Sequence, residues 1–176
     1  MPLNLLPFAN RESTVNDLVV LIIEDEPEVR DALARDLVPL VNTVRVETAD
    51  SVDDARSAID DIVVDGDRLA LVLADHRLPG TTGVDFLVEL EADAATHAVK
   101  KVLVTGQADH QDTIRAVNHA GLDHYIAKPW VPDLLLAVVK NALTEFVLEQ
   151  GIDPLPYVRD LDGPRLLEAY TGRGDR

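Results

Sequence analysis

The chain has 176 residues, 32 acidic against 16 basic side chains, a formal net charge of -16, a hydrophobic content of 47% and no cysteine. The length predicts one domain, the apolar content excludes disorder caused by low hydrophobicity, and the lack of cysteine excludes disulfides, thiolate metal sites and thiol catalysis. The negative charge argues against nucleic acids and anionic membranes as partners, because phosphate groups require Lys and Arg, and it favours a hard cation or a basic protein.

Residues 1–17 are expected to form an N-terminal leader. This segment lacks the basic start of a secretory signal and contains two prolines, Pro2 and Pro7. No stretch of the chain approaches the roughly 20 apolar residues that cross a membrane. We therefore expect a cytoplasmic protein with no membrane partner.

Apolar runs and helical patterns alternate from residue 18 onward. The run LVVLII at 18–23 is typical of a strand buried on both faces. A helix follows, with Pro27 in its first turn and apolar residues at i, i+4 and i+8. Residues 43–47 alternate like a strand nearer the sheet edge, and Ser51 is placed to cap the next helix.

The second half of the chain repeats this alternation. Strands are expected at 69–74, 99–105 and 123–127, separated by a Pro- and Gly-containing loop and by short helices at 84–92 and 112–121. Gly121 closes the second of these helices. A long helix then begins at Pro132 and ends near Gln150.

Five strand–helix units with short connections predict an α/β fold with a five-stranded parallel sheet and helices on both faces. The first, third and fourth strands are the most apolar, so they should be central, which gives the strand order 2-1-3-4-5. This is a doubly wound, flavodoxin-like arrangement spanning residues 18–150. Residues 151–176 are too short for a domain of their own and are expected to be a C-terminal extension, with a turn or short helix around 164–170.

The last predicted helix is apolar nearly all round, so the face turned away from the sheet needs a cover. The extension can provide that cover through its own apolar side chains: Leu155, Tyr157, Leu161, Leu166, Leu167 and Tyr170. A homodimer through this helix, or a partner protein, is the alternative.

Polar side chains follow directly after four of the predicted strands. Glu24 and Asp25 follow the first strand and Asp75 follows the third. The ends of the fourth and fifth strands add Thr105, Gly106 and Lys128. Because the carboxyl ends of parallel strands meet at one edge of the sheet, we expect one shallow pocket.

Phosphoryl transfer to a carboxylate accounts for this set of groups. Two carboxylates about 5 Å apart repel by about 3 kcal/mol at an effective dielectric constant of 20, and Mg2+, which prefers oxygen ligands, offsets that repulsion. Asp75 is the expected nucleophile. Lys128 would offer a positive charge and Thr105 a hydroxyl to the phosphoryl group, while Gly106 leaves room for the neighbouring N–H. Each residue alone is commonplace, and only their combination indicates this chemistry.

The sequence resembles the response-regulator receiver domains, the CheY-like domains of bacterial two-component signalling and phosphorelays. The resemblance is carried, in matching order and spacing, by LVVLIIEDEPEVRDAL, LVLADHRLPGTTGVDFL, VLVTGQAD and HYIAKPW, within residues 18–149. It implies the CheY-like fold, Mg2+ as cofactor, and phosphorylation of Asp75 by a histidine kinase or phosphotransfer protein. Asp25 would be the main metal carboxylate with Glu24 assisting, and the Arg77 backbone carbonyl would also face the metal.

The resemblance further implies that Thr105, Gly106 and Lys128 bind the phosphoryl group. Tyr125 occupies the position of an aromatic switch whose ring turns inward when Thr105 moves. Arg77 and Gln107 occupy the two positions that tune dephosphorylation, and neither offers a carboxylate to orient water. Two further departures are Glu24, where Asp is more frequent, and Gly106, where Ala is common.

We therefore expect a signalling receiver that is not an enzyme beyond self-dephosphorylation. Phosphorylation would shift the face made by the fourth helix, fifth strand and fifth helix between two states. The output would be contact with a downstream protein target or an effector domain rather than nucleic acid, unless the chain is a fragment of a larger protein. Two alternatives stay open: a constitutive interaction module that is never phosphorylated, and an aspartyl-phosphate hydrolase acting on phosphate esters.

Overall fold

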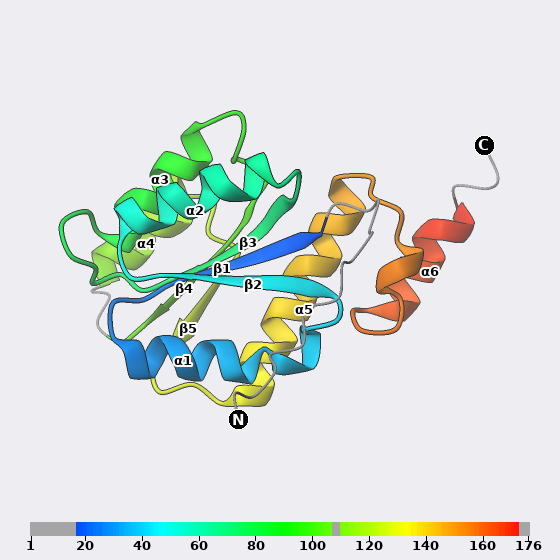
Figure 1. Cartoon of the computed structure of the whole chain (residues 1–176), viewed down its shortest axis with the longest axis horizontal. Coiled ribbons are helices and arrows are strands. Elements are labelled where there is room, and N and C mark those ends of the chain that lie inside the picture. Colours follow the sequence, from blue (N-terminus) through cyan, green and yellow to red (C-terminus); the bar gives the residue numbers. More distant parts are fainter. Residues whose placement is uncertain (1–16, 107–109, 173–176) are drawn as a thin grey trace, which may run out of the picture.

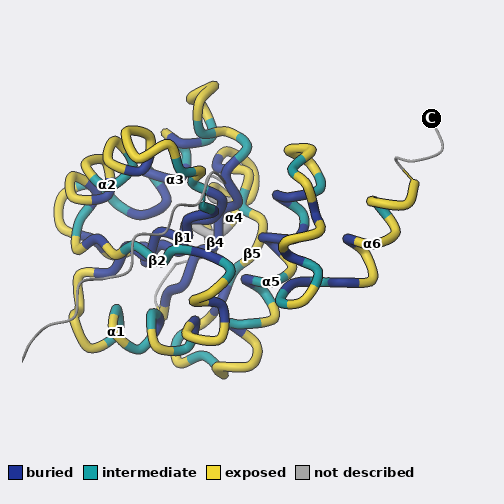
Figure 2. The backbone as a smooth tube through the Cα atoms, turned by 45° about the vertical axis from the view of Figure 1, so that its right-hand side comes forward, coloured by how far each residue is buried: buried dark blue, intermediate teal, exposed yellow. Residues whose placement is uncertain are grey.

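The computed structural model describes residues 17–106 and 110–172, in which a five-stranded parallel sheet lies between two layers of helices (Figure 1). The strands are β1 (Leu18–Ile23), β2 (Val44–Ala49), β3 (Arg68–Ala74), β4 (Lys100–Thr105) and β5 (His124–Ala127). Their order is β2-β1-β3-β4-β5, which confirms the predicted topology. Both β1 and β4 are buried along their whole length, because helices cover both faces of these central strands (Figure 2).

One face of the sheet is covered by α1 (Pro27–Asp36) and α5 (Pro132–Glu149) (Figure 1). The other face is covered by α2 (Val52–Val64), α3 (Gly83–Ala92) and α4 (His110–His119). The expected cap of α2 is present, since the Ser51 side chain accepts a hydrogen bond from the Asp54 N–H. None of the described helices combines the length and the apolar composition that a membrane span requires.

The structure differs from the expected elements at several boundaries. β2 continues to Ala49 because its backbone pairs with β1 as far as Ile23. Two 3-10 turns were not predicted, η1 (Val38–Leu40) and η2 (Leu155–Tyr157), and each contains a proline. α4 ends at His119, and the left-handed turn that follows it falls at Gly121, with φ 59°.

The C-terminal extension folds back onto α5 and contains α6 (Gly163–Gly172) (Figure 1). Three side-chain hydrogen bonds fasten it. The Thr43 hydroxyl donates to the Asp160 carboxylate at 2.7 Å, and the Asp162 N–H donates to the hydroxyl of buried Thr144 at 3.2 Å. The Arg165 guanidinium donates to the Asn141 amide oxygen on α5 at 2.9 Å. The six apolar side chains named above divide into two groups. Buried in the same core as α5 are Tyr157, Leu161 and Leu166.

The remaining three are 44–46% exposed, namely Leu155, Leu167 and Tyr170. On α5 itself Leu134 stays 51% exposed, so the extension covers this helix only in part. A homodimer through α5 stays a prediction. Nearly all of the expected leader, residues 1–16, lies outside the described residues.

Candidate functional site

Three carboxylates converge at the carboxyl ends of β1 and β3. Glu24, Asp25 and Asp75 each place one oxygen so that the three oxygens lie within 4.8 Å of one another. The sheet fixes this arrangement, because the Glu24 N–H donates to the Ala49 carbonyl and the Asp75 N–H donates to the Ile23 carbonyl, both at 3.0 Å. This donor set of carboxylate oxygens suits a hard divalent cation such as Mg2+.

Lys128 forms an ion pair with the buried member of this cluster. Its Nζ lies 2.6 Å from Glu24 Oε2 and 3.4 Å from Asp75 Oδ2. Glu24 is fully buried, and burial raises the pKa of its carboxyl even though the hydrogen bond from Lys128 works in the other direction. Burial also opposes the charge on Lys128, but the hydrogen bond to Glu24 and the charge of Asp75 outweigh it and raise the pKa of the ammonium. Glu24 thus holds Lys128 in its charged form next to Asp75.

The raised pKa of Glu24 predicts a dependence of stability on pH. The folded chain binds this proton more tightly than the unfolded chain, whose Glu has a pKa of 4.5, so the stability that Glu24 contributes is present below pH 4.5 and lost as pH rises through the raised pKa. The unfolding free energy of the wild type minus that of Glu24→Gln should therefore fall as pH is raised above 4.5. Urea denaturation of both proteins without divalent cations measures this difference.

Glu28→Gln is the matched control, since Glu28 is exposed in the first turn of α1. The unfolding free energy of the wild type minus that of Glu28→Gln should fall less as pH is raised above 4.5. If the Glu24 difference rises with pH, the direction argued from burial is wrong.

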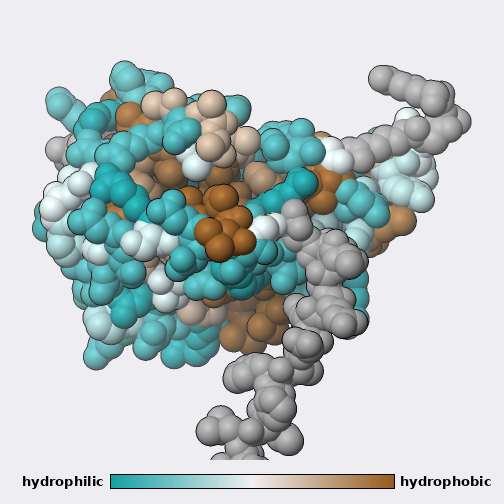
Figure 3. Space-filling model, turned by 45° about the horizontal axis from the view of Figure 1, so that its top comes forward, coloured by the Kyte–Doolittle hydropathy of each residue, from teal (hydrophilic) through white to brown (hydrophobic). Residues whose placement is uncertain are grey.

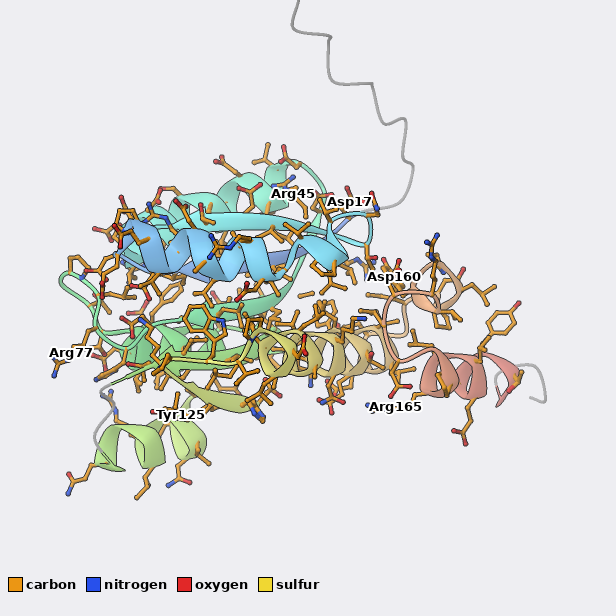
Figure 4. All side chains as sticks on the ribbon, turned by 90° about the horizontal axis from the view of Figure 1, so that it is seen from below. Asp17, Arg45, Arg77, Tyr125, Asp160 and Arg165 are labelled. Atoms are coloured by element: carbon orange, nitrogen blue, oxygen red, sulfur yellow. The ribbon has the colours of Figure 1, made fainter. Side chains whose placement is uncertain are left out.

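A cleft of about 420 Å3 opens above the carboxylates. Six of the predicted site residues line it, together with Glu26, for which the sequence indicated no role: Asp25, Glu26, Asp75, Arg77, Thr105, Gly106 and Lys128. Two predicted site residues, Glu24 and Tyr125, are not part of this lining. Arg77 is exposed, and Figure 4 shows it at the end of the molecule. Gln107 lies outside the described residues, so its expected role stays a prediction.

Tyr125 is connected to the end of β4 through its hydroxyl. The Tyr125 hydroxyl donates to the Thr105 backbone carbonyl at 3.2 Å, and the ring is half-buried on β5 (Figure 4). Thr105 is itself buried, and its carbonyl also accepts from the Lys128 N–H at 3.2 Å. A displacement of Thr105 would therefore reach both Tyr125 and Lys128 through one peptide group.

Gly83 is a positioning residue that the sequence reasoning missed. A Cβ on Gly83 would lie 1.8 Å from the backbone oxygen of Asp75, and the Gly83 N–H donates to the His76 carbonyl at 2.9 Å. In turn the His76 N–H donates to Asp75 Oδ1 at 2.7 Å, which orients the carboxylate. The start of α3 therefore packs directly against the backbone of the Asp75 loop. Only glycine fits at position 83, because a side chain there would overlap that backbone.

Gly106 is a contrasting case in the same cleft. A Cβ added to Gly106 would lie 3.6 Å from the Lys128 Cβ, which is an ordinary van der Waals distance. We expect Gly106→Ala to fold with unchanged stability or a gain of up to about 1 kcal/mol, because alanine reduces the entropy of the unfolded chain. Urea denaturation measures this, and a loss of more than about 1 kcal/mol would show that the loop requires glycine.

Comparison with known proteins identifies the family of this arrangement. The family model of the response regulator receiver domain matches residues 20–140. The chain is 37% identical over 124 residues to the hydrogenase transcriptional regulatory protein HoxA of Cupriavidus necator, covering 70% of this chain and 24% of that protein. It is 29% identical over 124 residues to the phosphate regulon transcriptional regulatory protein PhoB of Escherichia coli, covering 70% of this chain and 51% of that protein.

Among solved structures, a CheY-like response regulator receiver domain protein from Methanospirillum hungatei is 28% identical, with a TM-score of 0.65, and the match covers 76% of this chain and 99% of that one. The chain therefore spans about a quarter of the HoxA relative and about half of the PhoB relative.

Proposed function

Because the chain belongs to the response regulator receiver domain family of two-component signal transduction, we propose that Asp75 is its phosphoacceptor. The observation that supports this most is the convergence, beside the cleft, of three carboxylate oxygens within 4.8 Å of one another and an ammonium 3.4 Å from Asp75 Oδ2. Receiver domains act in signalling and are generally not enzymes, which favours phosphoacceptance over turnover of external substrates.

In this proposal Asp25 and Asp75 would hold Mg2+, with Glu24 assisting and the Arg77 backbone carbonyl as a further ligand. When bound, the ion would supply positive charge that offsets the carboxylates and the incoming phosphoryl group. Asp75 Oδ attacks the phosphorus of a phosphohistidine on a histidine kinase or phosphotransfer protein, and the histidine nitrogen leaves. The Lys128 ammonium and the Thr105 hydroxyl then donate to phosphoryl oxygens, with the Gly106 N–H beside them.

The output follows from the contacts of Thr105. When its hydroxyl moves to the phosphoryl group, its carbonyl carries the Tyr125 hydroxyl with it and the face made by α4, β5 and α5 changes. A protein partner or an attached effector domain reads that face. The absence of a nucleic-acid partner stays a prediction, because two of the relatives are named as transcriptional regulatory proteins and extend beyond the matched region.

The test is uptake of a phosphoryl group from acetyl phosphate by the full chain. We expect the intact mass to increase by one phosphoryl group in the presence of Mg2+ and to stay unchanged with EDTA. The fluorescence of Trp130, the only tryptophan, should change in parallel, since it follows Lys128 and Pro129 and its indole N–H donates to Asp36 on α1 at 2.8 Å. No uptake of acetyl phosphate or of beryllium fluoride would favour the constitutive module, and steady phosphate release from many esters would favour the hydrolase.

A further inference from the structure

An apolar groove lies at the amino end of the sheet, away from the Asp75 cleft. It has a volume of about 480 Å3, and its apolar lining comes from α2, β3, the segment before β4, and α5: Ile59, Val63, Leu69, Val99 and Phe146. It continues into a hollow of about 320 Å3 between α2 and α3, which shares Ile59, Asp60, Asp93 and Thr96 with it. Apolar atoms also surface among hydrophilic ones on the face seen in Figure 3.

The apolar lining of this groove is open to water mainly on the α2 side. Val63, on the last turn of α2, is 70% exposed, and Ile59 and Leu69 are half-buried, whereas Val99 and Phe146 are each only 5% exposed. Contiguous apolar surface of this kind marks an interaction site more often than scattered apolar residues do. An occupant that is itself apolar would remove this surface from water.

The chain enters the described structure at the mouth of the groove. The Asp17 N–H donates to Asp67 Oδ1 at 3.0 Å, and the Arg68 N–H donates to the Asp17 carbonyl at 2.9 Å. Asp67 and Arg68 both line the groove. Figure 4 shows Asp17 toward the end of the sheet opposite Arg77, so the segment before Asp17 is attached near this groove and far from the phosphoacceptor.

The sixteen residues before Asp17 have a composition that suits this groove, because they contain an apolar cluster and few acids. The apolar side chains gather within residues 3–8, with sequence LNLLPF. The charged side chains are limited to Arg11 and Glu12, so only one of the 32 acids of the chain lies in this segment. The groove carries three acids, Asp60, Asp67 and Asp93. The segment would repel them little because it has a single acid, and its Arg11 can form an ion pair with one of them.

We propose that residues 3–8 bind in this groove of their own chain. The eight residues between Phe8 and Asp17 span up to about 28 Å at about 3.5 Å each, which is long enough for residues 3–8 to reach the groove from Asp17. A tether of this length gives an effective concentration in the millimolar range, so a contact too weak for a free peptide is still formed within the chain. The leader is then a part of the receiver that covers its α2–α3 side.

Paired cysteines test this placement, since the chain has no cysteine of its own. Ala9→Cys lies next to the apolar segment, and Val63→Cys lies on the groove. The matched control pairs Ala9→Cys with Val41→Cys. Val41 is 59% exposed and lies just before β2, whose first residue Val44 pairs with Leu18, so it is also close to Asp17.

We expect the intramolecular disulfide to form about tenfold faster for the pair at positions 9 and 63 than for the pair at 9 and 41. Adding Leu5→Asp and Phe8→Asp to the first pair should reduce its rate to that of the control. Equal rates, or no effect of the added acids, would overturn the proposal. Disulfide-linked dimers as the main product would overturn it in favour of a groove on a second copy.

A second measurement does not depend on cysteine. Amide hydrogen exchange in the last turn of α2 and in residues 93–99 should be faster in Leu5→Asp/Phe8→Asp than in the wild type. Unchanged exchange in both regions would also overturn the proposal. Neither result depends on phosphorylation of Asp75, so this proposal and the proposed function can fail separately.

Discussion

We expect Asp75→Asn to abolish the Mg2+-dependent mass gain with acetyl phosphate. An amide lacks the anionic oxygen that attacks phosphorus, and it removes one of the three carboxylates that would hold the cation. The fold should persist, because the amide oxygen of Asn can still accept the His76 N–H that now bonds to Asp75 Oδ1. Intact mass spectrometry measures the loss, and circular dichroism checks the fold.

Two further variants make the result specific. Asp31→Asn changes an exposed carboxylate on α1 and should leave uptake unchanged. Asp25→Asn keeps the nucleophile and should increase the Mg2+ concentration required for half-maximal uptake. A mass gain that survives in Asp75→Asn would place the acceptor elsewhere, and peptide mapping would locate it.

Among substitutions that add a single methyl group near the site, Gly83→Ala should reduce stability the most. The added Cβ cannot lie 1.8 Å from the Asp75 backbone oxygen, so α3 and the Asp75 loop must separate. We expect a loss of about 3 kcal/mol of unfolding free energy, the upper end of the usual range for overpacked sites, and slower phosphoryl uptake by the folded fraction. Urea denaturation and the acetyl phosphate assay measure the two effects.

Gly106→Ala serves as the control for Gly83→Ala, because it adds the same methyl group in the same cleft at an ordinary contact distance. If both variants lose less than about 1 kcal/mol, the Asp75 loop adapts to a Cβ and the role given to Gly83 is refuted. If only Gly83→Ala is damaged, the close approach of α3 is what positions Asp75.

The topology could be predicted because it rests on short-range patterns. The runs at 18–23 and 69–74 are continuously apolar, and the run at 99–105 is apolar apart from two lysines and a final threonine. This composition placed the three runs at the centre, and the structure has β1, β3 and β4 there. The direction of parallel strands then brought Glu24, Asp75 and Lys128 to one edge without any knowledge of side-chain geometry.

Contacts between distant segments could not be predicted in the same way. That Lys128 lies closer to Glu24 than to Asp75 depends on differences of less than 1 Å between side chains. The role of Gly83 depends on how closely α3 approaches the Asp75 loop, and the sequence GTTG at 80–83 does not indicate that distance. The burial of Tyr157 and Leu166 depends on the path of the extension after α5, and a sequence of isolated prolines and acids leaves that path open.

Because the extension packs on α5, the end of the family match and the end of the hydrophobic core fall at different residues. The match to the receiver-domain family model ends at residue 140, within α5, whereas the buried core continues through Phe146 and Tyr157 to Leu166. The segment that the family model matches is therefore shorter than the unit that shares one core. Gene fusion or recombination that cut this receiver out at the family boundary would leave part of its core behind, so a functional exchange between proteins would have to carry the chain to at least Leu166.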